Sequence, residues 1–212
     1  MRDRGGLTFL LFILLFESIV ILTIIPGDYT QRVIQEESAL MSSRLGEDAY
    51  DEISHRANGY YNRHLIDSGF YASVYQFLMP AEDNTPEDGD VFRASSDPWF
   101  VYVDNRLRAF ASAYYQTMVR WSLMESWLPY FFVLLFPAFY DGFTSWRIKR
   151  SNFNYSSPII HSYSLAVIKY AIFIVIGLFV APILLDPVII PLVITIVCIA
   201  LGLAMGNFQK RI

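Results

Sequence analysis

The sequence predicts an all-α fold: a four-helix transmembrane protein with a helical extracytoplasmic domain inserted between helices 1 and 2. Of its 212 residues 54% are hydrophobic, and the mean hydropathy is +0.36. The apolar residues form long runs instead of being spread at the spacing of a soluble core, which is typical of membrane proteins. The predicted order is a cytoplasmic N-terminus at 1–6, a span at 7–25, the extracytoplasmic helical domain at 26–122, a span at 123–140, a cytoplasmic basic loop at 141–162, spans at 163–185 and 187–206, and a cytoplasmic tail at 207–212.

The first apolar run, residues 7–25, follows Arg2 and Arg4 and is interrupted only by Glu17 and small hydroxyl residues. It is long enough to cross a membrane, for which a helix needs roughly 17 to 25 residues. A cleaved signal peptide is the alternative, but its apolar core is usually about 7 to 15 residues long and ends at a small-x-small site. The run is longer and lacks such a site, so we expect an uncleaved anchor.

Residues 26–122 carry 15 acidic and 8 basic side chains, a net charge of −7, and no lysine. Asp28 with Gln31 three residues later predicts a capped helix start. An apolar stripe follows on one face of that helix, formed by Val33, Leu40, Met41 and Leu45. The segment is therefore expected to be helical.

A second helix of this domain is predicted to start at Asp97, with Pro98 at its first helical position. Residues 80–90 before it have the composition of a flexible acidic loop. No strong helix breaker follows before Pro129, so the helix is expected to run from the extracytoplasmic domain directly into the second span. Pro129 and Pro137 are expected to lie inside that span, where a static kink is favoured over a gating hinge.

Basic residues flank the spans at three places: Arg2 and Arg4, then Arg147, Lys149 and Arg150, and finally Lys210 and Arg211. The positive-inside rule places all three groups in the cytoplasm. Both termini and the 141–162 loop are then cytoplasmic, whereas residues 26–122 and a short turn at Asp186 and Pro187 lie on the other side.

The sequence offers no catalytic or metal-binding constellation. It contains no Gly-x-Ser-x-Gly elbow and no Walker A pattern. Glu125 and Asp141 are 16 residues apart, about 24 Å along a helix, which is too far for a shared acid/base pair. The histidines His55, His64 and His161 do not cluster with other metal ligands. We therefore expect no enzyme activity and no cofactor.

Two groups of intramembrane residues stand out. Glu17 lies near the middle of the first span, where a carboxylate costs about 2.5–3.5 kcal/mol, so it is expected to find a partner or to be protonated. Lys169 is a candidate partner, or its amine simply extends to the membrane surface. Cys198, Gly202 and Gly206 place small residues at four-residue spacing, which suits close helix packing within the monomer or in a homo-oligomer.

The basic segment after the second span has two interpretations that remain open. Asp141 and Gly142 shape the end of the helix, and Asp141 can pair with Arg147 or Lys149. The basic residues then either serve only as a topology signal, with headgroup contacts, or also dock a partner. Arg147, Lys149 and Arg150 are only three positive charges, too few to predict direct binding of nucleic acid in a chain of net charge −4.

The pattern P-x-x-x-DG-x-x-x-W-R-I-K-R, followed by SSPIIHSY and a hydrophobic hairpin, resembles the integrating conjugative element membrane protein family. This resemblance covers nearly the whole chain and implies a bacterial inner membrane protein from a DNA-transfer region. Such proteins are typically encoded near the coupling ATPase that delivers DNA to a type IV secretion channel. The matching residues are Asp141, Gly142, Arg147, Arg150, Ser157 and residues 161–163.

The favoured hypothesis is a non-enzymatic component of a conjugative type IV secretion apparatus. Its extracytoplasmic domain would contact channel or envelope proteins, and its basic loop would contact the coupling ATPase or relaxosome proteins. A small transporter is the first alternative, supported by Glu17, Lys169 and the two intramembrane prolines. An entry-exclusion or sensor-type membrane protein is the second.

Overall fold

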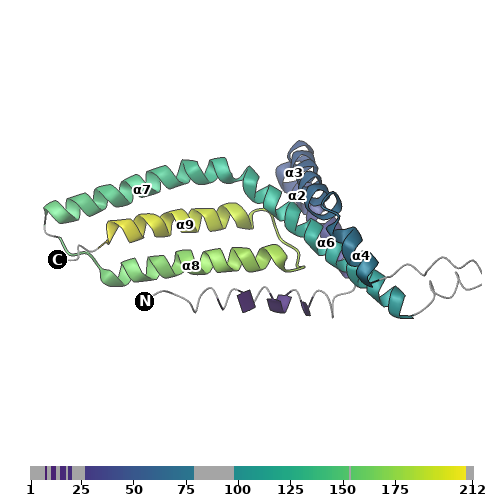
Figure 1. The fold of residues 1–212 in the computed structure, drawn as a ribbon. Coiled ribbons are helices and arrows are strands. Elements are labelled where there is room, and N and C mark those ends of the chain that lie inside the picture. The colour runs from purple at the N-terminus through teal and green to yellow at the C-terminus, as the bar shows by residue number, and fades with distance from the viewer. Residues whose placement is uncertain are drawn as a thin grey trace, which may run out of the picture. The chain divides into compact units, whose positions relative to one another are not determined.

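The computed structural model describes residues 8, 11–12, 15–17, 19–20, 27–78, 98–152 and 154–208. The described part consists of helices and the segments that connect them and contains no strand, which confirms the all-α prediction (Figure 1). Most of the predicted first span, the acidic loop at 80–90 and the basic residues at both termini lie outside the described residues. The elements are α2 (Gly27–Leu45), α3 (Glu47–Tyr61), the π-helix η1 (Asn62–Ile66), α4 (Phe70–Leu78), α6 (Pro98–Ser126), α7 (Leu128–Ser151), α8 (Pro158–Val180) and α9 (Ile189–Gly206).

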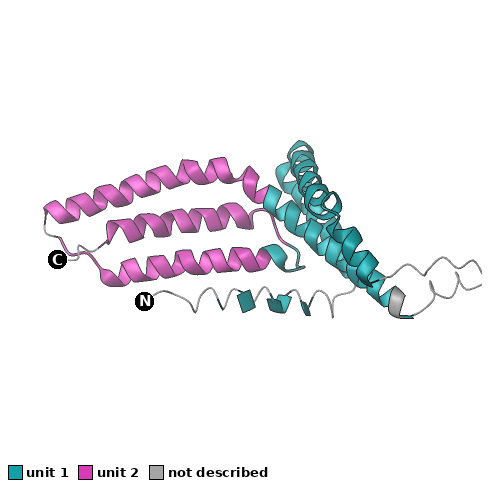
Figure 2. Ribbon diagram, in the orientation of Figure 1, with its two compact units in different colours: residues 1–122, 179–184 teal, residues 123–178, 185–212 magenta. Residues whose placement is uncertain are grey.

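The chain divides into two compact units (Figure 2). Unit 1 comprises residues 1–122 together with the short segment 179–184, and unit 2 comprises residues 123–178 and 185–212. Segment 179–184 thus belongs to unit 1, although the chain on either side of it belongs to unit 2.

Unit 1 is held together by apolar faces of α2 and α3 that pack against α6. Thr30, Val33, Glu37 and Met41 share one buried face of α2, at spacings of three and four residues. The chain turns from α2 into α3 at Gly46. The φ of Gly46 is 91°, a backbone conformation that residues with a side chain rarely adopt. The Ser122 hydroxyl of α6 donates a hydrogen bond of 2.9 Å to the Ile53 carbonyl of α3. Of the predicted apolar stripe, Val33 and Met41 are buried on this face, which also contains the carboxylate of Glu37, whereas Leu40 and Leu45 are half-buried.

The long helix predicted to start at residue 98 does begin at Pro98, but it ends at Ser126 and α7 starts at Leu128. The helix thus runs into the predicted second span, which starts at residue 123, but it is interrupted at Trp127. Pro129, which was expected to kink this span, explains the interruption, because it has no N–H to donate and its ring clashes with the carbonyl four residues earlier. At the break, the Trp127 N–H donates to the Met124 carbonyl in a tighter turn. Pro137 lies inside α7, as expected.

Two described helices, α8 and α9, are long and apolar enough to cross a membrane, with mean hydropathies of 2.2 and 2.6 over 18 residues. Residues 101–126 of α6 and all of α7 pass the same test only as a pair, so the number rises to three if this broken pair is one span. The chain is thus consistent with a membrane protein.

The boundaries at both ends of the predicted third span are different in the structure. The basic segment is largely helical, because α7 continues to Ser151 and the connection to α8 is short. α8 starts at Pro158, where proline suits the first turn of a helix, and ends at Val180. Pro182 then prevents the helix from continuing towards residue 185.

In unit 2, α9 lies between α7 and α8 and packs most closely against α7 (Figure 1). A Cβ added at Gly142 would lie 2.5 Å from the Gly202 carbonyl oxygen and 2.9 Å from the Met205 Cβ. A Cβ added at Gly202 would lie 3.0 Å from the Ala138 carbonyl oxygen. Buried Cys198 and Gly206 lie on the same helix. This small-residue face of α9 is therefore used inside the monomer, where α7 covers it.

We expect Gly142→Ala to destabilise unit 2 by about 1–3 kcal/mol, because the new methyl group collides with backbone atoms that cannot move independently of α9. The measurement is thermal unfolding of the purified protein in detergent. Gly59→Ala is the matched control: no atom lies within 4 Å of its added Cβ, and alanine in a helix interior is favourable by roughly 0.5–1 kcal/mol. Equal effects of the two substitutions would contradict the close packing.

Candidate functional site

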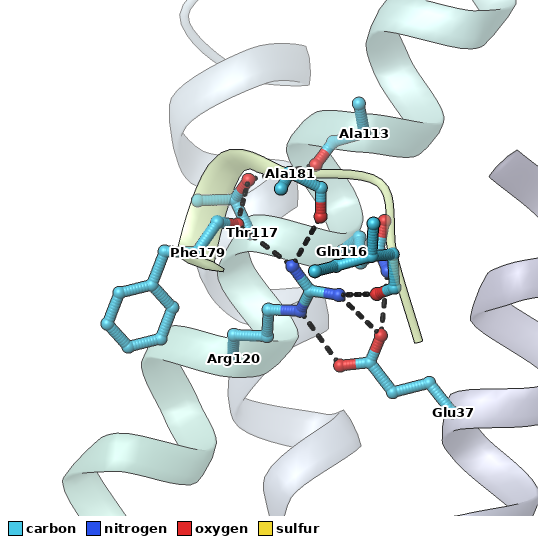
Figure 3. A network of polar contacts seen from close by, with 8 residues as sticks. Glu37, Ala113, Gln116, Thr117, Arg120, Phe179 and Ala181 are labelled. Carbon is cyan, nitrogen blue, oxygen red and sulfur yellow. Dashed lines mark hydrogen bonds and ion pairs between the residues drawn. The ribbon is translucent and has the colours of Figure 1, made fainter. Parts of the chain in front are cut away.

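The most extensive polar site of the described residues is centred on an ion pair inside unit 1, between Glu37 of α2 and Arg120 of α6 (Figure 3). Both side chains are buried, with exposed fractions of 2% and 0%. Arg120 Nε donates to Glu37 Oε1 and Nη2 donates to Oε2, each at 2.8 Å, so the pair is bidentate. Gln116, one turn before Arg120, donates to the same carboxylate at 2.7 Å. The charge of Arg120 is thus matched inside the protein.

The remaining donors of Arg120 bind backbone carbonyls of residues 179–184, which we call the strap. Nη1 donates to the Ala181 carbonyl at 2.7 Å and to the Phe179 carbonyl at 3.4 Å, and Nη2 donates to the Ile183 carbonyl. All five N–H groups of the guanidinium are then used, which is its full capacity. The Thr117 hydroxyl adds a bond of 3.3 Å to the Phe179 carbonyl.

The strap needs these donors because its own sequence prevents regular structure. Phe179 lies in the last turn of α8, where carbonyls have no partner within the helix. Pro182 stops the helix, and the following residues up to 186 are irregular. Within the strap, the Ile183 N–H donates to the Ala181 carbonyl at 2.8 Å. The carbonyls of Phe179 and Ile183 depend on other parts of the chain, and Arg120 donates to all three.

Beside the ion pair is a small hollow lined by residues of α2, α3 and α6, including Glu37, Tyr50, Tyr115 and Gln116. Burial raises the pKa of the Tyr115 phenol, and the nearby Tyr50 raises it further. The phenol is therefore neutral at physiological pH. The site contains donors and acceptors that satisfy one another and no activated nucleophile.

Sequence reasoning missed this site, although the sequence holds a signal for it. Glu37 lies between Val33 and Met41 in the apolar stripe of α2, and Arg120 lies among the buried residues Val119 and Leu123 of α6. A charge within an apolar helix face is expected to have a partner. Two such faces of opposite charge could have been paired.

At the end of α7, in unit 2, the three basic residues have two different roles. Arg147 and Arg150 are exposed, and each guanidinium lies over an aromatic ring one turn earlier, Phe143 at 6.0 Å and Trp146 at 5.4 Å. Lys149 points to α9 and donates to the Gly206 carbonyl at 3.0 Å and to the Asn207 Oδ1 at 2.9 Å. Lys149 thus caps α9, whereas the two arginines face outward.

Four residues of the family-like pattern contact this end of α9, namely Gly142, Lys149, Ser157 and His161. Buried Asn207 also accepts a bond of 3.3 Å from the backbone N–H of Ser157. His161 Nδ1 lies 2.8 Å from the Ala204 carbonyl, so this nitrogen carries the proton and donates. Gly142 packs against Gly202 one turn away. The pattern therefore describes how α7, the short connection and α8 enclose the end of α9.

The other predicted site residues do not join one site. Asp141 is exposed on α7. Lys169 is half-buried in α8, with Nζ 5.8 Å from the Phe173 ring centroid. Glu17 belongs to unit 1 and Lys169 to unit 2, and a contact between them stays a prediction. Among the described residues, no three His, Cys, Asp or Glu side chains are placed to hold a metal ion.

We expect Glu37→Ala to lower the free energy of unfolding by about 3–5 kcal/mol, because it leaves a buried, unpaired guanidinium. Replacing both partners by methionine often costs little for an isolated pair. Here the double variant should stay destabilised, because the Ile183 carbonyl loses its bond to Arg120, at about 1–3 kcal/mol for an unsatisfied group. The Phe179 and Ala181 carbonyls also lose Arg120 and keep only the Thr117 hydroxyl and the Ile183 N–H as donors.

The measurement is denaturant unfolding in detergent, followed by circular dichroism. Glu52→Ala is the control: it breaks a pair of 3.8 Å with Arg56 in which the carboxylate is 72% exposed. Such pairs contribute about 0–1 kcal/mol. A double methionine variant as stable as the unsubstituted protein would show that the strap does not depend on Arg120.

Comparison with known proteins points to conjugation. Residues 23–210 match a protein family described as IncC plasmid conjugative DNA transfer protein DtrJ-like. No curated protein and no solved structure matches the chain. The matched region covers both units, and the expectation of a conjugative transfer family is confirmed. The chain belongs to the DtrJ-like family of IncC plasmid conjugative DNA transfer proteins.

Proposed function

We propose that this conjugative DNA transfer protein is a non-enzymatic inner-membrane component of a type IV secretion apparatus that docks the coupling ATPase. The observation that carries the docking role is the pair of exposed arginines at the end of α7, Arg147 and Arg150. Their neighbour Lys149 is engaged with α9, so the two arginines are presented on a helix end that α9 holds in place. Guanidinium groups favour bidentate contacts with carboxylates, which suits an acidic surface on a protein partner.

The proposed topology has both termini and the end of α7 in the cytoplasm, with most of unit 1 on the other side of the membrane. The basic residues near the ends of the spans support this orientation, as does the net charge of −7 on residues 26–122. With the first span at 7–25, four crossings bring the C-terminus back to the side of the N-terminus. In this topology the coupling ATPase reaches Arg147 and Arg150 from the cytoplasm.

This topology predicts the result of reporter fusions. A reporter that is active only outside the cytoplasm should give a signal when fused at Asp88 and none when fused at Asn154. The two positions lie in the acidic stretch and in the connection between α7 and α8. The opposite pattern would refute the orientation and the docking role with it.

We expect Arg147→Glu with Arg150→Glu to reduce conjugative transfer by at least about a hundredfold, since reversing two charges on one small patch repels the partner that they attracted. The measurement is the frequency of transconjugants in matings with the complemented deletion strain. Arg63→Glu, an exposed arginine of η1 in unit 1, is the matched control and should transfer normally.

The same arginines also contribute to the topology, so the double variant is first checked for its abundance and for the reporter signal at Asn154. Lys149 is left unchanged, because its loss would disturb the end of α9. A double variant that inserts and accumulates normally and transfers DNA at the unsubstituted rate would rule out docking through these residues.

A further inference from the structure

The strap is the place where the hairpin of α8 and α9 is connected to unit 1. Chain residues up to 178 and from 185 onward belong to unit 2, while 179–184 belong to unit 1. The chain therefore passes from one unit to the other immediately before the strap and again immediately after it. A further crossing lies within α6, between Ser122 and Leu123. Movement of the hairpin relative to unit 1 has to be taken up at the crossings beside the strap or has to pull the strap out of unit 1.

One side chain provides most of what holds the strap in unit 1. The carbonyls of Phe179, Ala181 and Ile183 alternate along the strap, and all three accept hydrogen bonds from Arg120. Figure 3 shows the labelled carbonyls of Phe179 and Ala181 directed towards the guanidinium. The Thr117 hydroxyl contributes less, because its single proton is shared between the Ala113 carbonyl of α6 at 2.9 Å and the Phe179 carbonyl at 3.3 Å.

The hydrogen bonds from Arg120 to the strap form or break together, because they all come from one rigid group. A guanidinium is planar and rigid, so its donors cannot turn independently. The same group that binds the three carbonyls is held by both carboxylate oxygens of Glu37. Turning Arg120 away from the strap would also disturb this buried ion pair, which is costly in a low-dielectric interior. The strap is thus either held by Arg120 as a whole or released as a whole.

We propose that Arg120 is a clamp that couples unit 1 mechanically to the hairpin of α8 and α9, and that DNA transfer requires the clamp to be closed. With the clamp closed, a partner that moves unit 1 also moves the strap and, through the chain, the end of α8 and the start of α9. With the clamp open, the strap no longer transmits a movement of unit 1 to the hairpin, which is then joined to unit 1 only through α6, α7 and the packing of α9 on α7. The requirement for transfer rests on the proposed function, whereas the clamp itself does not. Arg120 is a positioning residue in this role.

Arg120→Lys separates the clamp from the ion pair. Lysine keeps the charge that matches Glu37 but has three donors on one nitrogen in place of five in a fork, so it cannot span the carboxylate and three separate carbonyls. Thr117→Val is the matched control, since it removes the hydroxyl that is shared between the Ala113 and Phe179 carbonyls and leaves all the bonds of Arg120.

The first readout is hydrogen exchange of the full-length protein in lipid nanodiscs, measured by mass spectrometry on peptides covering residues 179–188. We expect exchange at least about tenfold faster in Arg120→Lys, since hydrogen bonds to a charged group are lost and the strap opens locally. Thr117→Val should change it far less. Unchanged exchange in Arg120→Lys would overturn the clamp.

The second readout is transfer, with a covalent link as a substitute for the clamp. Arg120→Lys should accumulate normally but transfer poorly. In a Cys198→Ala background, Thr117→Cys with Phe179→Cys allows the strap to be tied to α6 by a bis-methanethiosulfonate linker, and reductant removes the tie. We expect the linker to restore transfer to Arg120→Lys and reductant to abolish it again, with single-cysteine variants unaffected. Normal transfer of Arg120→Lys despite faster exchange, or no rescue by a linker shown to have reacted, would overturn the coupling.

A second variant covers the case in which Arg120→Lys does not fold. Inserting glycines between Leu184 and Leu185 leaves Arg120 intact and adds slack where the strap meets unit 2. This variant should keep the slow exchange of the strap and lose transfer, and normal transfer would again overturn the coupling. The Arg147→Glu, Arg150→Glu variant should leave strap exchange unchanged, which separates a failure of docking from a failure of the clamp.

Discussion

The buried pair of Glu37 and Arg120 is the interaction on which the architecture of unit 1 depends. Removing two charges from water is expensive, and a buried pair by itself often gives no net stability compared with apolar side chains. Here the pair also supplies donors to backbone carbonyls that have no helix to satisfy them. The main role of Arg120 is therefore to supply hydrogen-bond donors to the carbonyls of the irregular strap. The carboxylate of Glu37 balances its charge and so makes its burial possible.

This arrangement connects three parts of the chain that are far apart in the sequence. α2 follows the predicted first span along the sequence, α6 leads towards α7, and the strap joins α8 to α9. One ion pair and one set of hydrogen bonds connect α2, α6 and the strap within unit 1. Helices in lipid have little hydrophobic force to hold them to one another, so polar contacts of this kind contribute more to their association.

In unit 2, neighbouring residues of α7 have different roles: some pack closely against α9 and others bind its last carbonyls. Gly142 and Gly202 let α7 and α9 approach to backbone contact, so that Lys149 can reach the last carbonyls of α9. The exposed Arg147 and Arg150 are then presented by a helix end fixed in position, which is what a docking surface requires. The family-like pattern mixes both kinds of residue, and only Arg147 and Arg150 among its basic residues are free of the contact with α9 that engages Lys149.

The sequence by itself determined the features that depend on neighbours along the chain. It predicted a helical protein, the helix start at Pro98, the short turn at Asp186 and Pro187, and a conjugative transfer family. The break between α6 and α7 was not predicted from the sequence, because Pro129 was expected only to kink the span. The end of the third span was placed at residue 185 instead of Val180, because the effect of Pro182 on the preceding helical turn was not considered. Only the tertiary structure decided that Glu37 meets Arg120, 83 residues away, and that this arginine reaches the strap. Helical periodicity tells which face of a helix is buried, but not which other face it meets, and a buried charge acquires its role only from that second face.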